Sequence, residues 1–232
     1  MRESRNVRVV FSSITNFLKD KNNMATRLLY FTTSGSYQHL KALECWNAPW
    51  VSEYDVHLYS NRGLSLSWQD ALNSIPSKKR TISIDKNEYM HQKGAIRAFV
   101  FSRSLFEKYE WVIRTNPDVH VVSHISFSNW MMNTQVHAIL ANCNLDVECV
   151  TSCARAIVHT DFTIFRPQFL MWNVSASNAE MHISLLMRQI LSRHNVRWLQ
   201  GKGYRDRSCR IRAGVREHNQ TVVHKRSHLG CK

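Results

Sequence analysis

Residues 109–122 have the sequence YEWVIRTNPDVHVV, and the remainder of the chain has the pattern of a scaffold around them. Trp111–Arg114 combine aromatic and β-branched side chains, a composition typical of a strand buried on both faces. Pro117 has no amide hydrogen to donate, so regular pairing is predicted to end there. Asn116 and Asp118 would then project from the carboxyl end of the strand, where open α/β sheets bind ligands.

The Asn-Pro-Asp tripeptide has two interpretations. An acid at a strand end can hold a hard divalent cation, and through it a diphosphate, when a second oxygen ligand lies two residues earlier. Asn116 and Asp118 have that spacing. Asn, Pro and Asp also dominate turns for purely local reasons, so a turn without a ligand is the alternative.

The segments before this strand predict the start of a βαβ unit. A buried strand is expected at 27–33, further strands at 54–59 and 80–84, and helices at 37–46 and 87–109. The polar stretch 64–80 predicts a loop or a short helix. After the central strand, 136–140 and 156–165 predict strands, 178–191 a helix and 221–224 a terminal strand. This order predicts an α/β fold with a mixed, mostly parallel sheet and the 111–115 strand near its centre.

Length and composition favour one domain. The chain has 232 residues, a hydrophobic fraction of 44% and seven Trp, enough for a sizeable core, and no Gly/Pro/Ser-rich linker divides it. We expect 1–23 to be a poorly ordered extension and 24–232 to form the domain. No segment approaches the roughly 20 apolar residues that a membrane-spanning helix requires.

The net charge of +14 predicts an anionic partner, which can be nucleic acid, a membrane surface or a small phosphorylated ligand. Basic residues are densest after Val196, without a helix-turn-helix, zinc-finger or RNA-recognition signature. Nucleic-acid binding therefore has no recognisable motif behind it. In the nucleic-acid alternative, 197–216 would bind a single strand, with Trp198 and Tyr204 as stacking surfaces. A solvated basic tail is the remaining interpretation.

Two further features concern charge and helix starts. Lys93 and Arg97 are four residues apart on one face of the expected helix, where they could meet one diphosphate or form a solvated stripe. Asn178 is a plausible N-cap, and Glu180 lies in the first helical turn, where the helix dipole favours an acid.

Six Cys permit disulfides in a secretory compartment, although reduced, buried thiols would give the same count. The Cys and His spacings do not indicate a structural zinc site. Asn173 and Asn219 begin glycosylation sequons, a tripeptide that also arises by chance.

The motifs and their order resemble the GT-A-fold, nucleotide-sugar-dependent glycosyltransferases, in particular a eukaryotic group in which Trp-Val-Ile-Arg-x-Asn-Pro-Asp-Val stands where other members have Asp-x-Asp. The resemblance covers about residues 26–231. Its specific segments are 91–97, 111–119, 159–162 with 165–167, and 222–224 with 228–229. It implies a single Rossmann-like domain that transfers a sugar from a nucleoside diphosphate sugar to a hydroxyl acceptor. A catalytically inactive relative would have similar motifs.

The resemblance also implies residue roles around a divalent cation. Asp118 matches the second acid of Asp-x-Asp, which binds Mn²⁺ or Mg²⁺ on the donor diphosphate. His224 matches a histidine near the C-terminus that often completes that metal site, with His228 as its substitute. Asn116 replaces the first acid, and an amide oxygen is a weaker ligand for a hard cation, so metal dependence is open and basic residues could carry more of the phosphate charge.

Further roles follow for the donor and the acceptor. Thr32 and Thr33 match the end of the first strand, which contacts the nucleotide. The donor-binding set is completed by Lys93, Arg97, Arg114 and Asn116. Glu180 resembles the acid that supports the acceptor or acts as base, and Asp161 is a second candidate. The resemblance implies the Golgi or endoplasmic reticulum lumen, whereas a complete chain without an anchor would be soluble or cytoplasmic.

Overall fold

The structure is a computed structural model that describes residues 27–87, 89, 91–121, 124–142, 158–193, 195–199 and 222–224. Seven strands form one sheet in the order β3-β2-β1-β4-β7-β6-β8, and a second sheet pairs β5 with β9. The strands are β1 Arg27–Thr33, β2 Asp55–Ser60, β3 Arg80–Ile84, β4 Trp111–Thr115, β5 Val119–Val121, β6 Ala138–Asn142, β7 Val158–Phe165, β8 Val196–Leu199 and β9 Val222–His224. The expected extension 1–23 lies outside the described residues.

The sheet is mixed and mostly parallel, as predicted. β1 pairs in parallel with β2 and β4, β2 with β3, and β6 with β8, whereas β7 is antiparallel to both β4 and β6. β4 is fourth of the seven strands, and all five of its residues are buried. From β1 the chain adds β2 and β3 on one side and then β4 on the other. The strand order therefore reverses between β1 and β4.

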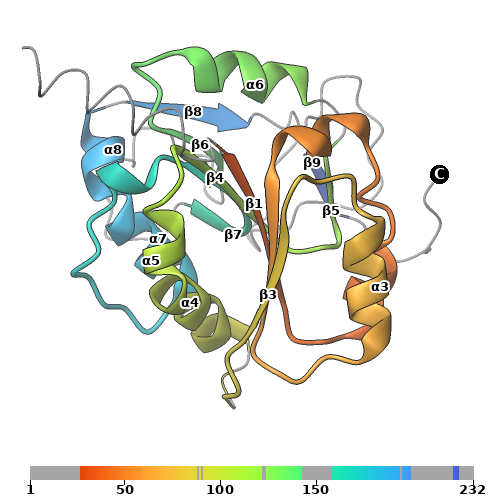
Figure 1. Cartoon of the computed structure of the whole chain (residues 1–232). Helices are drawn as coiled ribbons and strands as arrows, with labels where there is room; N and C mark the ends of the chain where they lie inside the picture. Colours follow the sequence, from red (N-terminus) through yellow and green to blue (C-terminus); the bar gives the residue numbers. More distant parts are fainter. Residues whose placement is uncertain are drawn as a thin grey trace, which may run out of the picture.

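Helices cover both faces of the sheet (Figure 1). The α-helices are α2 Tyr37–Leu43, α3 Leu66–Ser74, α4 His91–Phe101, α5 Arg103–Phe106, α6 Ile125–Met132, α7 Ala179–Leu186 and α8 Arg188–Ser192. Short 3₁₀ turns, η1 Pro49–Glu53 and η3 Pro167–Phe169, join neighbouring elements.

Alternation along the strands divides the apolar side chains into two cores. Leu29 and Ile113, which are in register on β1 and β4, pack with the core that includes α2, α3 and α6. Leu28 and Val112, one residue earlier on each strand, pack with the opposite core under α4, α5, α7 and α8. Both faces of the central strands are therefore dry, which explains their near-continuous apolar sequence.

The expected helix over 87–109 is interrupted. It starts at His91 and breaks at Ser102, after which α5 follows. The Ser102 hydroxyl lies 2.6 Å from the hydroxyl of Tyr30 in the core, a contact that draws this residue toward the sheet. The expected helix over 178–191 is likewise divided into α7 and α8 at Met187, and the helix expected over 37–46 ends at Leu43.

The stretch 64–80, which predicted a loop or a short helix, contains the helix α3, and α6 and β8 were not predicted at all. The terminal strand predicted over 221–224 is present as β9, which pairs antiparallel with β5 directly after the Asn-Pro-Asp turn. Within the described ranges, no helix combines the length and the apolar character needed to span a membrane.

Candidate functional site

Polar side chains from three strands meet at one edge of the sheet. Thr32 and Thr33 end β1, Asn116 follows β4, and both strands point the same way. β7 runs antiparallel, with Phe162 paired to Thr115, so the first half of β7 lies at the carboxyl end of β4. This brings Asp161 beside Asn116, at the point where the strand order reverses.

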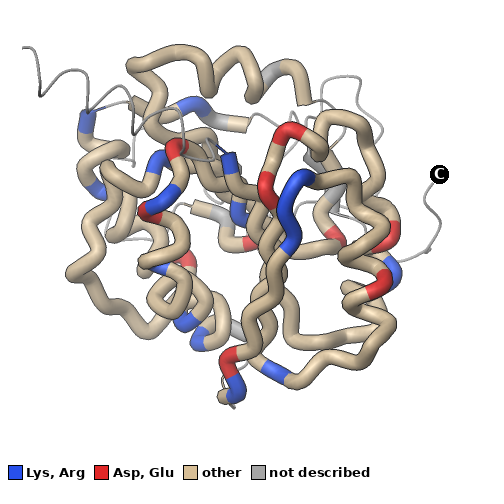
Figure 2. The backbone as a smooth tube through the Cα atoms, viewed as in Figure 1, with Lys and Arg blue, Asp and Glu red and all other residues tan. Residues whose placement is uncertain are grey.

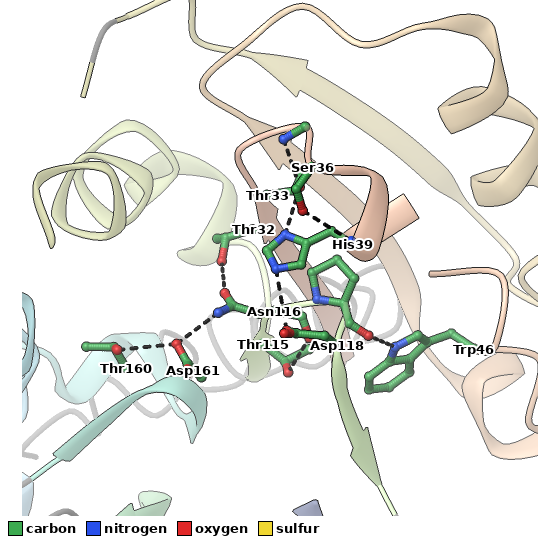
Figure 3. Close-up of polar contacts among 12 residues, drawn as sticks. Thr32, Thr33, Ser36, His39, Trp46, Thr115, Asn116, Asp118, Thr160 and Asp161 are labelled. Carbon is green, nitrogen blue, oxygen red and sulfur yellow. Dashed lines mark hydrogen bonds and ion pairs between the residues drawn. The ribbon is translucent and has the colours of Figure 1, made fainter. Parts of the chain in front are cut away.

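The Asn-Pro-Asp segment is a turn, and the turn is held in place. The amide of Val119 donates to the carbonyl of Asn116 at 3.2 Å, which closes it. The indole Nε1 of Trp46 donates to the carbonyl of Pro117 at 2.8 Å (Figure 3). The predicted turn is therefore present, and it places Asn116 and Asp118 at the carboxyl end of β4.

A chain of hydrogen bonds crosses β1, β4 and β7. Arg114 Nη2 donates to Thr32 Oγ1 at 2.8 Å, and Thr32 Oγ1 donates to Asn116 Oδ1 at 2.8 Å. Asn116 Nδ2 then donates to Asp161 Oδ1 at 2.8 Å, and the Thr160 hydroxyl donates to the same oxygen at 3.4 Å (Figure 3). Thr32 and Asn116 thus connect the buried guanidinium of Arg114 to the carboxylate of Asp161.

Arg114 lies beneath the edge of the sheet. The residue is 2% exposed, and its guanidinium carbon is 5.8 Å from the centre of the Phe99 ring. Burial lowers the pKa of Arg114, and the negative charge of Asp161 acts in the opposite direction. The guanidinium therefore reaches the site through the Thr32 hydroxyl.

A second network joins β1, α2 and the turn. Thr33 Oγ1 accepts from the amide of Gly35 and lies 3.0 Å from His39 Nδ1, while His39 Nε2 lies 3.5 Å from Asp118 Oδ1 (Figure 3). Gly35 has φ +77°, a left-handed conformation that glycine adopts without strain. Ser36 caps α2 by accepting from the amide of His39 at 3.2 Å.

Sequence reasoning missed His39. The available signal was its position: it lies in the first turn of the helix that follows the first buried strand, and therefore at the same edge as Asp118. The signal is weak, because a histidine in a helix is far more often a surface or core residue than a ligand.

The donor set suits a divalent cation in part. Asp118 supplies a carboxylate, and the neighbouring His39 supplies an imidazole nitrogen whose other ring nitrogen contacts Thr33, an arrangement common for metal-binding histidines. In the backbone register of β5 and β9, His224 is opposite Val119, the residue after Asp118. The His224 side chain and His228 lie outside the described residues, among which no three His, Cys, Asp or Glu side chains gather for a metal.

The two predicted phosphate-binding cations on α4 differ in their surroundings. Arg97 Nε lies 2.6 Å from Asp85 Oδ2, and this contact holds the pKa of Asp85 below its usual range. Lys93 is exposed in the first turn of α4, which follows β3 and so begins at the same edge as the site. Lys93 is therefore the better placed of the two to meet a diphosphate, because Arg97 already has a carboxylate partner.

Glu180 begins α7 beside α4. Asn178 caps the helix by accepting from the amide of Met181, as predicted, and Gln92 of α4 donates to Glu180 Oε1 at 3.1 Å. The side-chain oxygen of Gln92 also accepts from the amide of Ala179 at 2.6 Å. Gln92 thus joins the starts of both helices and holds Glu180.

Replacing Gln92 by alanine is expected to lower the free energy of unfolding by about 1 kcal/mol, because α7 loses a cap for its first amide and Glu180 loses its donor. Urea unfolding measures the change. Gln69→Ala is the matched control, since Gln69 is an exposed helical glutamine that bonds only Asn73 of its own helix in the described contacts. Equal stability of the two variants would contradict this role.

The fold is similar to that of solved glycosyltransferases. Glucosyl-3-phosphoglycerate synthase from Mycobacterium tuberculosis, in complex with phosphoglyceric acid, superposes with a TM-score of 0.51 at 11% identity, covering 85% of this chain and 75% of the synthase. The same synthase with Mn²⁺, uridine diphosphate and glucosyl-3-phosphoglycerate gives a TM-score of 0.50. The chain has the GT-A glycosyltransferase fold.

A further solved structure covers less of this chain. The bifunctional glycosyltransferase WbbM has a TM-score of 0.48 at 13% identity, and this chain spans 39% of its length. Neither a protein-family model nor a curated protein matches the sequence. The likeness of the GT-A fold is therefore structural, at identities too low to carry residue roles from one protein to another.

Along the described parts of the chain, Lys and Arg positions are interspersed with Asp and Glu positions (Figure 2). Of the segment 197–216 that the nucleic-acid alternative requires, 197–199 belong to β8, which pairs with β6 at the edge of the sheet. The remainder of that segment lies outside the described residues.

Proposed function

We propose that this protein is a glycosyltransferase that moves a sugar from a nucleoside diphosphate sugar to a hydroxyl acceptor. The observation that carries the proposal is the convergence of Thr32, Thr33, Asn116 and Asp118 at the strand-order reversal between β1 and β4. Open α/β sheets bind ligands at this place because the two neighbouring loops diverge there. The M. tuberculosis synthase, which has the same fold, is described with uridine diphosphate and Mn²⁺.

The reaction needs stabilisation of the diphosphate leaving group. A divalent cation, Mn²⁺ or Mg²⁺, would supply positive charge there, held by Asp118 with His39 and by His224 or His228. The nitrogen ligand favours Mn²⁺ over Mg²⁺. Lys93 contributes a cation to the same leaving group, with Arg97 in a lesser part because it is paired with Asp85.

The acceptor hydroxyl needs a base. Glu180 and Asp161 are the candidates, and both lie at the carboxyl edge of the sheet. Thr32 and Thr33 line the nucleotide side of the same edge, with Arg114 and Asn116 behind them. The acceptor can be a glycan, a protein or a lipid, because the site residues distinguish only the hydroxyl group.

Replacing Asp118 by asparagine is expected to weaken Mn²⁺-dependent binding of uridine diphosphate by roughly tenfold or more, because an amide oxygen binds a hard cation less well than a carboxylate. His39→Ala is expected to act in the same direction with a smaller effect. Isothermal titration with and without Mn²⁺ measures both changes. Asp70→Asn, an exposed change on α3, is the matched control. Wild-type binding that ignores both Mn²⁺ and a chelator would contradict the metal assignment.

We further propose that the protein works in an oxidising compartment such as the Golgi or endoplasmic reticulum lumen. Cys45 is disulfide-bonded, and disulfides persist mainly in such compartments. Asn173 of the first sequon is exposed and therefore open to a glycan. Mass spectrometry of the protein from its natural source tests this: glycan on Asn173 supports the lumen, and an unmodified Asn173 with reduced Cys45 contradicts it.

A further inference from the structure

Asn116 uses both ends of its amide. Its Oδ1 accepts from the Thr32 hydroxyl and its Nδ2 donates to Asp161 Oδ1, each at 2.8 Å. An ionised carboxylate has no hydrogen to donate, so aspartate could make only the first of these contacts. Thr32 Oγ1 in turn accepts from Arg114, which leaves the hydroxyl proton to point at Asn116. The bond from Arg114 thus orients the Thr32 hydroxyl, and the Thr32 hydroxyl orients the Asn116 amide.

Asp161 is held by its main chain as well. Its carbonyl accepts from the amide of Asn116 at 3.1 Å, which extends the β4–β7 ladder by one bond beyond Thr115. The Thr160 hydroxyl gives Asp161 Oδ1 a second donor. Because the backbone and the side chain are both fixed by neighbouring strands, the carboxylate has a defined position beside the turn that carries Asp118.

We propose that Asn116 is a positioning residue that holds the Asp161 carboxylate in place, and that Asp161 is the catalytic base of the transfer; the second part rests on the proposed function. Asp161 takes the proton of the acceptor hydroxyl while the new bond forms between the acceptor oxygen and the anomeric carbon. The bond from that carbon to the diphosphate oxygen breaks, and its electron pair leaves with the diphosphate. Glu180 instead supports the helix contact with Gln92.

The assignment explains why the motif of this chain has an amide at 116. An aspartate there would restore Asp-x-Asp. Its carboxylate would, however, stand where the Asn116 amide now donates to Asp161 Oδ1 at 2.8 Å, so two carboxylates would be in contact. Two ionised carboxylates at this distance repel each other, and Asp161 would also lose the hydrogen bond that the Asn116 amide donates. Asn116→Asp is therefore expected to damage the site.

Stability of three variants tests the pairing. Asn116→Asp is expected to lower Tm by roughly 5 °C, consistent with the loss of one partly buried charge-assisted contact in a chain of this size. Asp161→Asn is expected to cost less, because an amide at 161 can still accept. The exchange variant Asn116→Asp with Asp161→Asn is expected to recover most of the loss, since the amide at 161 can donate to the carboxylate at 116. A recovery within error of zero overturns the pairing.

Turnover separates positioning from mere packing. The probes are UDP-glucose, UDP-N-acetylglucosamine and GDP-mannose with Mn²⁺, water as acceptor, and released nucleoside diphosphate as the readout. Asp161→Asn and the exchange variant are expected to lose roughly 100-fold or more in kcat while their donor Kd stays within about twofold. Asn116→Ala is expected to lower kcat by about tenfold with KM unchanged, since the carboxylate is present but no longer held.

Two results would overturn the assignment. An exchange variant that regains turnover together with stability would show that the carboxylate does not act from position 161. An Asn116→Asp variant that binds Mn²⁺ and donor more tightly than wild type would make 116 a ligand position. Failure of wild type to bind any of the three donors would overturn the proposed function and the base role together, whereas the stability recovery, measured without ligand, decides the pairing in either case.

Discussion

Replacing Arg114 by alanine is expected to lower the free energy of unfolding by about 3 to 5 kcal/mol, the largest stability change predicted for this chain. The residue is 2% exposed and packs against the Phe99 ring, so truncation leaves a cavity in the core between β4 and α4. Thr32 Oγ1 also loses its donor at 2.8 Å. Urea unfolding, with the transition followed by tryptophan fluorescence, measures the loss.

A second substitution at this position separates volume from charge. Burial lowers the pKa of Arg114, which means that the native state already carries a cost for keeping the guanidinium out of water. Methionine fills a similar volume without that cost, so Arg114→Met is expected to stay within about 1.5 kcal/mol of wild type. If alanine and methionine destabilise equally, the charge of Arg114 contributes more than its volume, and the expectation is wrong.

Acidification from pH 6.5 to 4 is expected to remove roughly 3 kcal/mol of stability through His57 alone. His57 is 6% exposed on β2, and both ring nitrogens contact hydroxyls of β3, Thr81 at 2.7 Å and Ser83 at 2.8 Å. Burial lowers the pKa of His57 to about 4. The unfolded chain therefore takes up a proton near pH 6.5, and the folded protein does so only near pH 4.

This difference in proton uptake determines how stability changes with pH. Between those two values the unfolded state binds more protons, so stability falls as pH falls, and above pH 6.5 the contribution of His57 is constant. Burial also lowers the pKa of His124 and of His182, which adds to the same trend. Unfolding at a series of pH values measures the slope. His57→Gln, whose amide can donate and accept but does not titrate here, is expected to flatten it; an unchanged slope would contradict the assignment.

The central strands were predictable because strands that are buried on both faces have nearly continuous apolar sequences. The run from Trp111 to Thr115 is apolar and β-branched except at Arg114, and Pro117 marks its end. The sequences of α6 and β8 have a weaker hydrophobic pattern. α6 is short and exposes Ile125 and Met132, so its apolar residues do not follow one face, and β8 lies at the outer edge of the sheet.

The candidate site was predictable where it depends on strand ends. Thr32, Asn116 and Asp161 lie together because parallel and antiparallel partners of one strand fix where each residue falls. His39 was not predictable, because its distance from Asp118 depends on how α2 packs beside the turn. The direction of Arg114 into the core was also hidden, since a basic residue in a strand is equally compatible with a ligand contact.

The antiparallel pairing of β7 with β4 has a consequence for how this protein folds. The Thr32–Asn116 and Asn116–Asp161 contacts join residues 84 and 45 positions apart in sequence. Contacts of such separation close large loops, and the entropy of closure is lost before the contacts repay it. The first three parallel strands can pair while the chain still lacks β7, so the polar network is expected to form in the last step of folding. In pulse-labelling hydrogen exchange, the amide of Asn116, which donates to the carbonyl of Asp161, should gain protection later than the amides of β1 and β2.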